Sequence, residues 1–172
     1  MAAISKIFRK NRKVNVTLEV EKSPEEICVQ GYMDAINRHA GLEELLAFYV
    51  SDQAKIYFED GLTVSAKRSC ETFQQLYRCF PDIQWLYDSV EPQKNGSIVV
   101  NETRARGTHT GEPFVLFGKD EKTVQPTGKK FENDPARFFF KVEQGKIKSI
   151  TVVALGTKTG PVGIYEDLTS TK

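Results

Sequence analysis

Residues 97–109 read Ser-Ile-Val-Val-Asn-Glu-Thr-Arg-Ala-Arg-Gly-Thr-His, a long alternating run that ends just after a glycine. Because successive side chains of a strand point to opposite faces, this run predicts a strand with two different sides. The charged side chains at 102, 104 and 106 indicate the side that faces solvent. The outer side is therefore expected to carry Ile98, Val100, Glu102, Arg104 and Arg106. The inner side is expected to carry Val99, Asn101, Thr103 and Ala105.

Two small polar side chains, Asn101 and Thr103, are unusual on an inner face that is otherwise apolar. A buried polar group costs free energy unless it has a hydrogen-bond partner. Either neighbouring residues satisfy these two side chains, or they line a cavity that holds water or a ligand. The functional interpretation of the chain depends on which alternative holds.

Composition indicates one globular domain. The chain has 172 residues, of which 40% are hydrophobic and 27% are charged, and its net charge is +1. The near-neutral charge argues against a nucleic-acid binder with a broad basic face. No apolar run approaches the length of a membrane-spanning helix. The three cysteines, Cys28, Cys70 and Cys79, have no metal-ligand spacing, which favours buried free thiols in a reducing compartment. We therefore expect a soluble, intracellular and cytoplasmic protein without integral membrane association.

Three segments differ in character. Residues 1–22 are a basic leader and a short extended arm, residues 23–155 are the folded domain, and residues 156–172 are expected to form a loose tail. The leader has five Lys or Arg residues and no acidic residue in its first 13 positions. A solvated leader and an organelle-targeting or membrane-touching segment both remain open.

Helices are expected first in the domain. Ser23 can cap a helix, Pro24 suits the first helical position, and Glu26 completes a capping box. Helical periodicity continues over 42–49 and 66–79. The remainder predicts strands joined by tight turns, at 53–60, 83–91, 97–109, 129–142 and 147–154.

This order predicts an α+β fold in which the N-terminal helices pack on the concave face of a strongly curved antiparallel sheet. The result is a cone whose hollow is a natural site for a small molecule.

Several short segments together resemble the SnoaL-like polyketide cyclase family of the nuclear transport factor 2-like superfamily. The resemblance covers about residues 23–155, and no single segment is specific by itself. The segments are Tyr32 to Asn37, Phe80 to Ile83, Arg106 to Phe114, Pro126 to Lys130 and Gly145 to Ile147.

The resemblance implies the cone fold, pairing of two sheets in a homodimer, and no cofactor. The family's cyclases close a ring by aldol condensation, using an acid/base pair on the last two strands. Here Phe138 and Val152 occupy those two positions, and neither side chain can transfer a proton. The chain also has Thr103 where the family commonly has an aromatic residue, and it has an insertion near 118–122. Two interpretations of the insertion remain open: it gates a pocket, or it is a surface loop without a function.

Candidate site residues follow from these positions. Expected to line the cone and contact a ligand are Tyr32, Tyr57, Trp85, Asn101, Thr103, Phe138 and Val152. His109, three residues before Glu112, is the candidate for acid/base catalysis, although the same segment resembles a structural turn of the family. No metal cluster or phosphate-binding glycine loop is evident. The outer charges, together with Arg137 and Lys141, suit a dimer interface or a solvated face.

Three functions remain open. The first is a dimeric domain that binds a small, mostly apolar ligand without the usual acid/base pair. The second is a cofactor-independent isomerase, cyclase or lyase (hydratase) that acts on a small hydrophobic substrate through other residues. The third is a protein-interaction module, whose cone can be filled by its own side chains.

Overall fold

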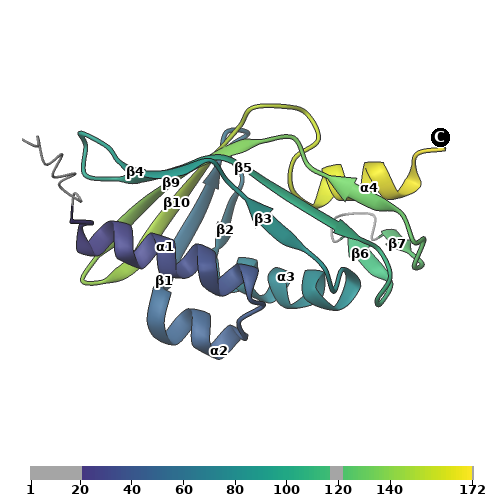
Figure 1. Ribbon diagram of the computed structural model, residues 1–172, viewed down its shortest axis with the longest axis horizontal. Coiled ribbons are helices and arrows are strands. Elements are labelled where there is room, and N and C mark those ends of the chain that lie inside the picture. Colours follow the sequence, from purple (N-terminus) through teal and green to yellow (C-terminus); the bar gives the residue numbers. More distant parts are fainter. Residues whose placement is uncertain (1–20, 117–121, 172) are drawn as a thin grey trace, which may run out of the picture.

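The computed structural model describes residues 21–116 and 122–171 (Figure 1). The basic leader, nearly all of the expected extended arm and most of the insertion lie outside the described residues. The helices are α1 Pro24–Asn37, α2 Leu42–Glu44, the π-helix η1 Leu45–Tyr49, α3 Ala66–Cys79 and α4 Gly160–Thr169. The first five strands are β1 Val50–Phe58, β2 Thr63–Ser65, β3 Gln84–Leu86, β4 Ser89–Pro92 and β5 Ile98–Thr108. The last five are β6 Phe114–Leu116, β7 Lys122–Val124, β8 Lys130–Glu132, β9 Ala136–Glu143 and β10 Lys146–Ala154.

The main sheet runs in the order β2-β1-β10-β9-β5-β3, and β4 and β8 also pair with β5. It curls around α1 and α3, which confirms the α+β cone (Figure 1). One expectation is corrected, because β1 pairs with β10 in parallel whereas the other pairs are antiparallel. β6 and β7 form a separate hairpin beside the sheet. No helix among the described residues is long and apolar enough to cross a membrane.

The start of α1 is fixed as the sequence predicts. The Ser23 hydroxyl accepts a hydrogen bond from the backbone of Glu26 at 3.1 Å, and the Glu26 carboxylate accepts one from the backbone of Ser23 at 2.9 Å. This reciprocal capping box satisfies two amide groups that a helix start otherwise leaves unpaired. It orients α1 so that Val29, Met33 and Ile36 are buried against the sheet.

A β-bulge in β5 changes which face of the strand points inward. The pairing with β9 shifts between Val100 and Thr103, and Glu102 has a φ of +52°. A bulge places an extra residue in one strand, so the alternation of faces restarts after it. Ile98 and Val100 therefore belong to the core before the bulge, and Ala105 belongs to it afterwards. The strict alternation was wrong for Asn101, which is half-buried, and correct for Thr103 and Ala105, whereas Val99 is 3% exposed but lies outside the main core cluster.

Cross-strand registers define three rows of side chains. Two rows face the helices and form the concave wall: Ile56–Ile150–Phe140–Ile98, and Phe58–Val152–Phe138–Val100. The third, here called the outer row, lies on the opposite face of the sheet, where Val99 is buried and the other members are exposed or half-buried: Tyr57–Thr151–Phe139–Val99. The concave rows position the candidate site, and the outer row is the centre of the opposite sheet face.

The C-terminal segment is not the loose tail that its composition predicts. It forms α4, in which Ile164 and Leu168 are buried. The Lys129 ammonium donates to the carbonyl oxygens of Leu168 at 2.9 Å and Ser170 at 2.7 Å, so a cation caps the end of this helix. The strand expected over 129–142 is correspondingly divided into β8 and β9, separated by residues 133–135.

The segment after β5 is docked on the end of α3. The amides of Gly111 and Glu112 donate to the carbonyls of Cys79 and Arg78 at 3.0 and 2.9 Å. Beside it, the Asp82 carboxylate accepts from both the amide and the hydroxyl of Thr108 at 2.7 Å. These contacts hold the far end of the sheet against α3.

The Asp82 contact predicts a pH-dependent contribution to stability. Burial acts to raise the pKa of Asp82, but the Thr108 hydrogen bonds and the Lys130 charge lower it overall. A carboxyl whose folded pKa is depressed stabilises above its unfolded value of about 3.9, and this contribution is lost as pH falls through the folded value. Asp82→Asn is therefore expected to unfold at lower urea concentration than the parent at pH 7. A gap that does not narrow when the comparison is repeated at pH 3 would contradict this assignment.

Candidate functional site

Tyr32 occupies the centre of the cone. It projects from α1, is 3% exposed, and its ring meets Phe140 of β9 edge-on at a centroid distance of 5.8 Å. Burial, and then the proximity of Cys70 and Tyr77, raise the pKa of Tyr32 well above its ordinary value. The phenol therefore stays protonated at neutral pH.

Tyr77 and Cys70 approach Tyr32 from the same face of α3, because they are seven positions apart, close to two helical turns. The Tyr77 hydroxyl is buried and has no hydrogen-bond partner. Burial raises its pKa, as does the nearby Cys70, and burial raises the pKa of Cys70 itself to about 11. This cluster can donate hydrogen bonds at neutral pH, but it is unsuited to removing a proton from a substrate.

His39 fixes the orientation of Tyr77. The two rings are stacked with centroids 4.4 Å apart and an interplanar angle of 14°. The Nε2 atom of His39 lies 3.0 Å from the carbonyl oxygen of Ile83, which holds the imidazole in place. His39 itself has a φ of +60° at the turn after α1.

Trp85 forms a rigid wall of the cone. Its backbone is held at both ends by the Asn37 amide, which accepts from the Trp85 amide at 2.7 Å and donates to the Trp85 carbonyl at 3.0 Å. The indole meets Phe73 and Tyr77 edge-on at 5.1 and 6.0 Å. α1, α3 and the sheet therefore all contribute to one aromatic enclosure.

Phe138 and Val152 are direct cross-strand partners on the concave wall. Both are half-buried and pack against the core together with Phe58. Thr103 is 2% exposed, and its hydroxyl is 3.5 Å from the Val100 carbonyl, a long hydrogen bond across the bulge. These positions give the cone an apolar, partly accessible side.

Two residues that were expected to contact the ligand lie outside the cone. Tyr57 is 42% exposed and belongs to the outer row, so it does not project into the cone. Asn101 is half-buried, and its amide donates to the Ser89 hydroxyl at 3.0 Å across the β4–β5 pair. The β-bulge is the physical reason for the second correction, since Asn101 precedes it.

His109 is fully buried at the far end of β5. Its Nε2 atom lies 3.1 Å from the backbone carbonyl of Glu112, its ring packs 5.1 Å from that of Phe80, and its Nδ1 atom has no partner. The expected His–Glu side-chain couple does not form, because the Glu112 carboxylate pairs with Arg78 at 3.0 Å.

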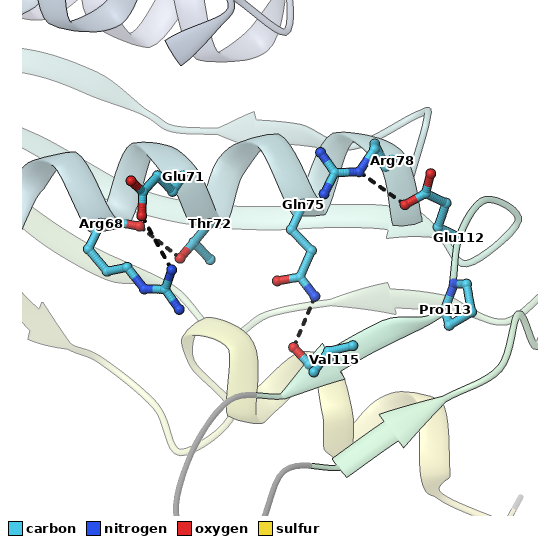
Figure 2. A pocket seen from close by; sticks show the side chains of 8 residues that line it. All are labelled: Arg68, Glu71, Thr72, Gln75, Arg78, Glu112, Pro113 and Val115. Atoms are coloured by element: carbon cyan, nitrogen blue, oxygen red, sulfur yellow. Dashed lines mark hydrogen bonds and ion pairs between the residues drawn. The ribbon is translucent and has the colours of Figure 1, made fainter.

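Two surface hollows are described, and neither lies in the cone. One, of about 310 Å³, lies between α3 and β6, where Arg78 pairs with Glu112 and Gln75 donates to the Val115 carbonyl at 3.1 Å (Figure 2). The other, of about 580 Å³, includes Asp82, Arg106 and Lys130. Both mix opposite charges, many of which are already paired. No group of three or more metal-ligating side chains occurs among residues 21–116 and 122–171.

Three polar members of the cone escaped sequence reasoning, namely Tyr77, Cys70 and His39. The only available signal was the helical stripe that contains Cys70 and Tyr77, which looks the same as ordinary core packing. The approach of Tyr32 from another helix was needed to distinguish them.

Comparisons with known proteins agree with the fold. The family described as a SnoaL-like domain matches residues 29–150. No curated protein matches the sequence. A candidate SnoaL-like polyketide cyclase from Jannaschia sp. CCS1 is similar in structure, with a TM-score of 0.60, 14% identity, and coverage of 89% of this chain and 99% of that one.

Two Streptomyces structures are similar as well. AclR, a candidate hydroxylase from Streptomyces galilaeus, has a TM-score of 0.58 and 21% identity, over 76% of this chain and 74% of that one. IdmH, a candidate polyketide cyclase from Streptomyces antibioticus, has a TM-score of 0.57 and 20% identity, over 78% and 93%. At these identities the likeness shows a shared fold.

Proposed function

Because this chain belongs to the SnoaL-like domain family, we propose that it binds a small, mostly apolar molecule in its cone. The observation that carries the proposal is the enclosure of Tyr32 and Tyr77 by apolar and aromatic side chains of α1, α3 and the concave wall. A few polar groups in a mostly apolar enclosure are typical of small-molecule sites.

The side chains of the cone favour binding over ring closure. Phe138 and Val152 stand where the family resemblance places the cyclases' proton-transfer residues, and neither can exchange a proton. Burial raises the pKa of Tyr32, Tyr77 and Cys70 in the cone, and the fourth titratable group there, His39, has its Nε2 atom 3.0 Å from the Ile83 carbonyl oxygen. The two tyrosines and the cysteine are protonated at neutral pH, so they support recognition of a ligand better than general-base catalysis.

Neither of the two hollows described above lies in the cone, and the proposal therefore includes movement of side chains to admit the ligand. The half-buried residues Phe58, Phe138 and Val152 lie on the partly accessible side and are the ones expected to part. A ligand that binds only the folded state raises its stability, by about 2.7 kcal/mol at a hundredfold excess over Kd.

The proposal includes a homodimer formed through the sheet face that carries the outer row. Tyr57 and Phe139 leave apolar surface exposed there, and the exposed Lys55 and Lys141 flank them. A two-fold dimer uses the same patch on both subunits, so it covers the apolar row and places the flanking charges at the rim.

Native mass spectrometry of gently purified protein, compared with the denatured mass, tests the proposal. We expect a dimer that carries a small additional mass, which is lost on denaturation, and a raised Tm relative to extracted protein. A bare monomer whose Tm does not change with any member of a panel of apolar compounds would contradict it. That result would favour the interaction-module alternative, in which the packed cone is only a core.

A further inference from the structure

The larger of the two surface hollows, of about 580 Å³, lies outside the cone and has no part in the proposed function. It is lined by exposed side chains of β3, β5 and β8, among them the cross-strand row Gln84–Arg106–Glu132. α4 packs against β8 and adds Asp167 to the lining. A hollow of this volume is within the range that small organic ligands occupy.

The carboxylates of this hollow are already engaged by other groups of the protein. The three pairs are Asp82 with Thr108 at 2.7 Å, Asp167 with Lys158 at 2.8 Å, and Glu132 with Arg104 at 3.9 Å. Two of the three negative charges are therefore balanced by cations that do not line the hollow, and the third accepts two hydrogen bonds. Little capacity remains on these acids to hold a cationic ligand.

The two cations of the hollow, Arg106 and Lys130, are in the opposite situation. Neither forms an ion pair with a carboxylate within residues 21–116 and 122–171. Arg106 donates from Nη2 to the Gln84 side-chain oxygen at 3.3 Å, which uses one of the five N–H donors of a guanidinium. The Lys130 charge helps to lower the pKa of Asp82, but the two side chains are not in contact as an ion pair. The unused binding capacity of the hollow is therefore cationic.

The strand register brings these two cations to one place. Arg106 is opposite Glu132 and Thr108 is opposite Lys130, so Arg106 and Lys130 are diagonal neighbours on the same face of the β5–β8 pair. Diagonal neighbours lie about 7–8 Å apart, within reach of each other's long side chains. An anion between them can accept two parallel hydrogen bonds from the guanidinium and another from the ammonium.

We propose that this hollow binds the carboxylate group of a small organic acid between Arg106 and Lys130. The planar guanidinium matches the two oxygens of a carboxylate. A single negative charge suits the site better than a phosphate dianion, because the carboxylates of Asp82, Glu132 and Asp167 line the same hollow and repel each additional charge. The site is on the sheet face opposite to the cone, so it is independent of the proposed function.

Nuclear magnetic resonance titration of the isotope-labelled full chain at pH 7 tests the site with three probes that share one ring. Benzoate carries one charge, benzamide is its neutral counterpart, and phenyl phosphate is a dianion. Benzoate is expected to shift the amide signals of residues 106–108 and 130–132 and to bind at least about fivefold more tightly than benzamide. Phenyl phosphate is expected to bind no more tightly than benzoate.

Arg106→Gln and Lys130→Gln should each weaken benzoate binding by about 3- to 10-fold and leave benzamide binding unchanged. Both side chains are exposed, so neither variant should lose its fold, and unchanged signals elsewhere in the spectrum check this. Arg137→Gln is the matched control, because Arg137 is an exposed arginine of β9 that does not line the hollow. It should leave the affinity for benzoate unchanged.

Four results would overturn the proposal. They are no shift at about 10 mM benzoate, equal affinity for benzoate and benzamide, tighter binding of phenyl phosphate, and an equal loss of affinity in the Arg137→Gln control. Shifts confined to α1 and the concave wall would also overturn this site, because they would place the probe in the cone. The proposed function is tested separately by the native mass, so either proposal can fail without the other.

Discussion

Gly111→Ala is expected to destabilise the protein by about 3 kcal/mol or more. A Cβ atom at this position would lie 1.8 Å from the carbonyl oxygen of Arg78 and 3.1 Å from that of Cys79. These are backbone atoms at the end of α3, and the amides of Gly111 and Glu112 donate to the same two carbonyls. Relief of the overlap therefore requires the segment to separate from the helix and lose both hydrogen bonds.

Urea unfolding monitored by circular dichroism measures this loss. Gly41→Ala is the control, because an added Cβ there has no neighbour within 4 Å and its φ is −67°. Its cost is the small N-cap preference for glycine over alanine, below about 1 kcal/mol. If the two variants unfold at the same midpoint, the close packing of this segment on α3 is disproved.

The close packing of the segment that contains Gly111 also concerns the role of His109. His109 is fully buried, and the segment that carries it is hydrogen-bonded to the end of α3. The sequence alone allowed both a catalytic histidine and a structural turn. The burial of His109 and the ion pair of Glu112 with Arg78 favour the interpretation of this segment as a structural turn.

Local signals were enough to predict the fold class. The capping box at Ser23, the apolar stripe over 66–79 and the turn before Lys146 each depend on neighbours in sequence. Their order then leaves few arrangements besides helices on a curled sheet. Strand alternation also placed Thr103 on the inner face, and the structure buries it.

The sequence predictions that the structure corrects failed because of contacts between residues far apart in the chain. The bulge at Glu102 contains no glycine that would predict it from the sequence. It reverses which residues of β5 face the core, and Asn101 therefore faces outward. The parallel pairing of β1 with β10 joins strands from opposite ends of the domain. α4 depends on Lys129, which is remote in sequence and caps its last carbonyls. None of these contacts leaves a pattern within its own segment.

Phe138→Asp combined with Val152→Asp is expected to cost at least about 4 kcal/mol of unfolding free energy at pH 7. Replacing core phenylalanine alone typically costs about 3–5 kcal/mol, and these variants add two carboxylates to an apolar wall. The residues are cross-strand partners, so the new charges also repel each other. Their pKa values should lie above the unfolded value, so the cost appears as pH rises past about 4 and shrinks at pH 3.

The matched control places the same pair of charges on the opposite face of the same strands. Phe139→Asp with Thr151→Asp joins two cross-strand partners of the outer row, where Thr151 is exposed. Its two charges repel equally but remain hydrated, so the folded monomer should lose less than half as much free energy as the cone variant. If the sheet face is a dimer interface, this control instead converts dimer to monomer, as read by sedimentation. Equal loss in both double variants would mean that Phe138 and Val152 are not part of an enclosed cone.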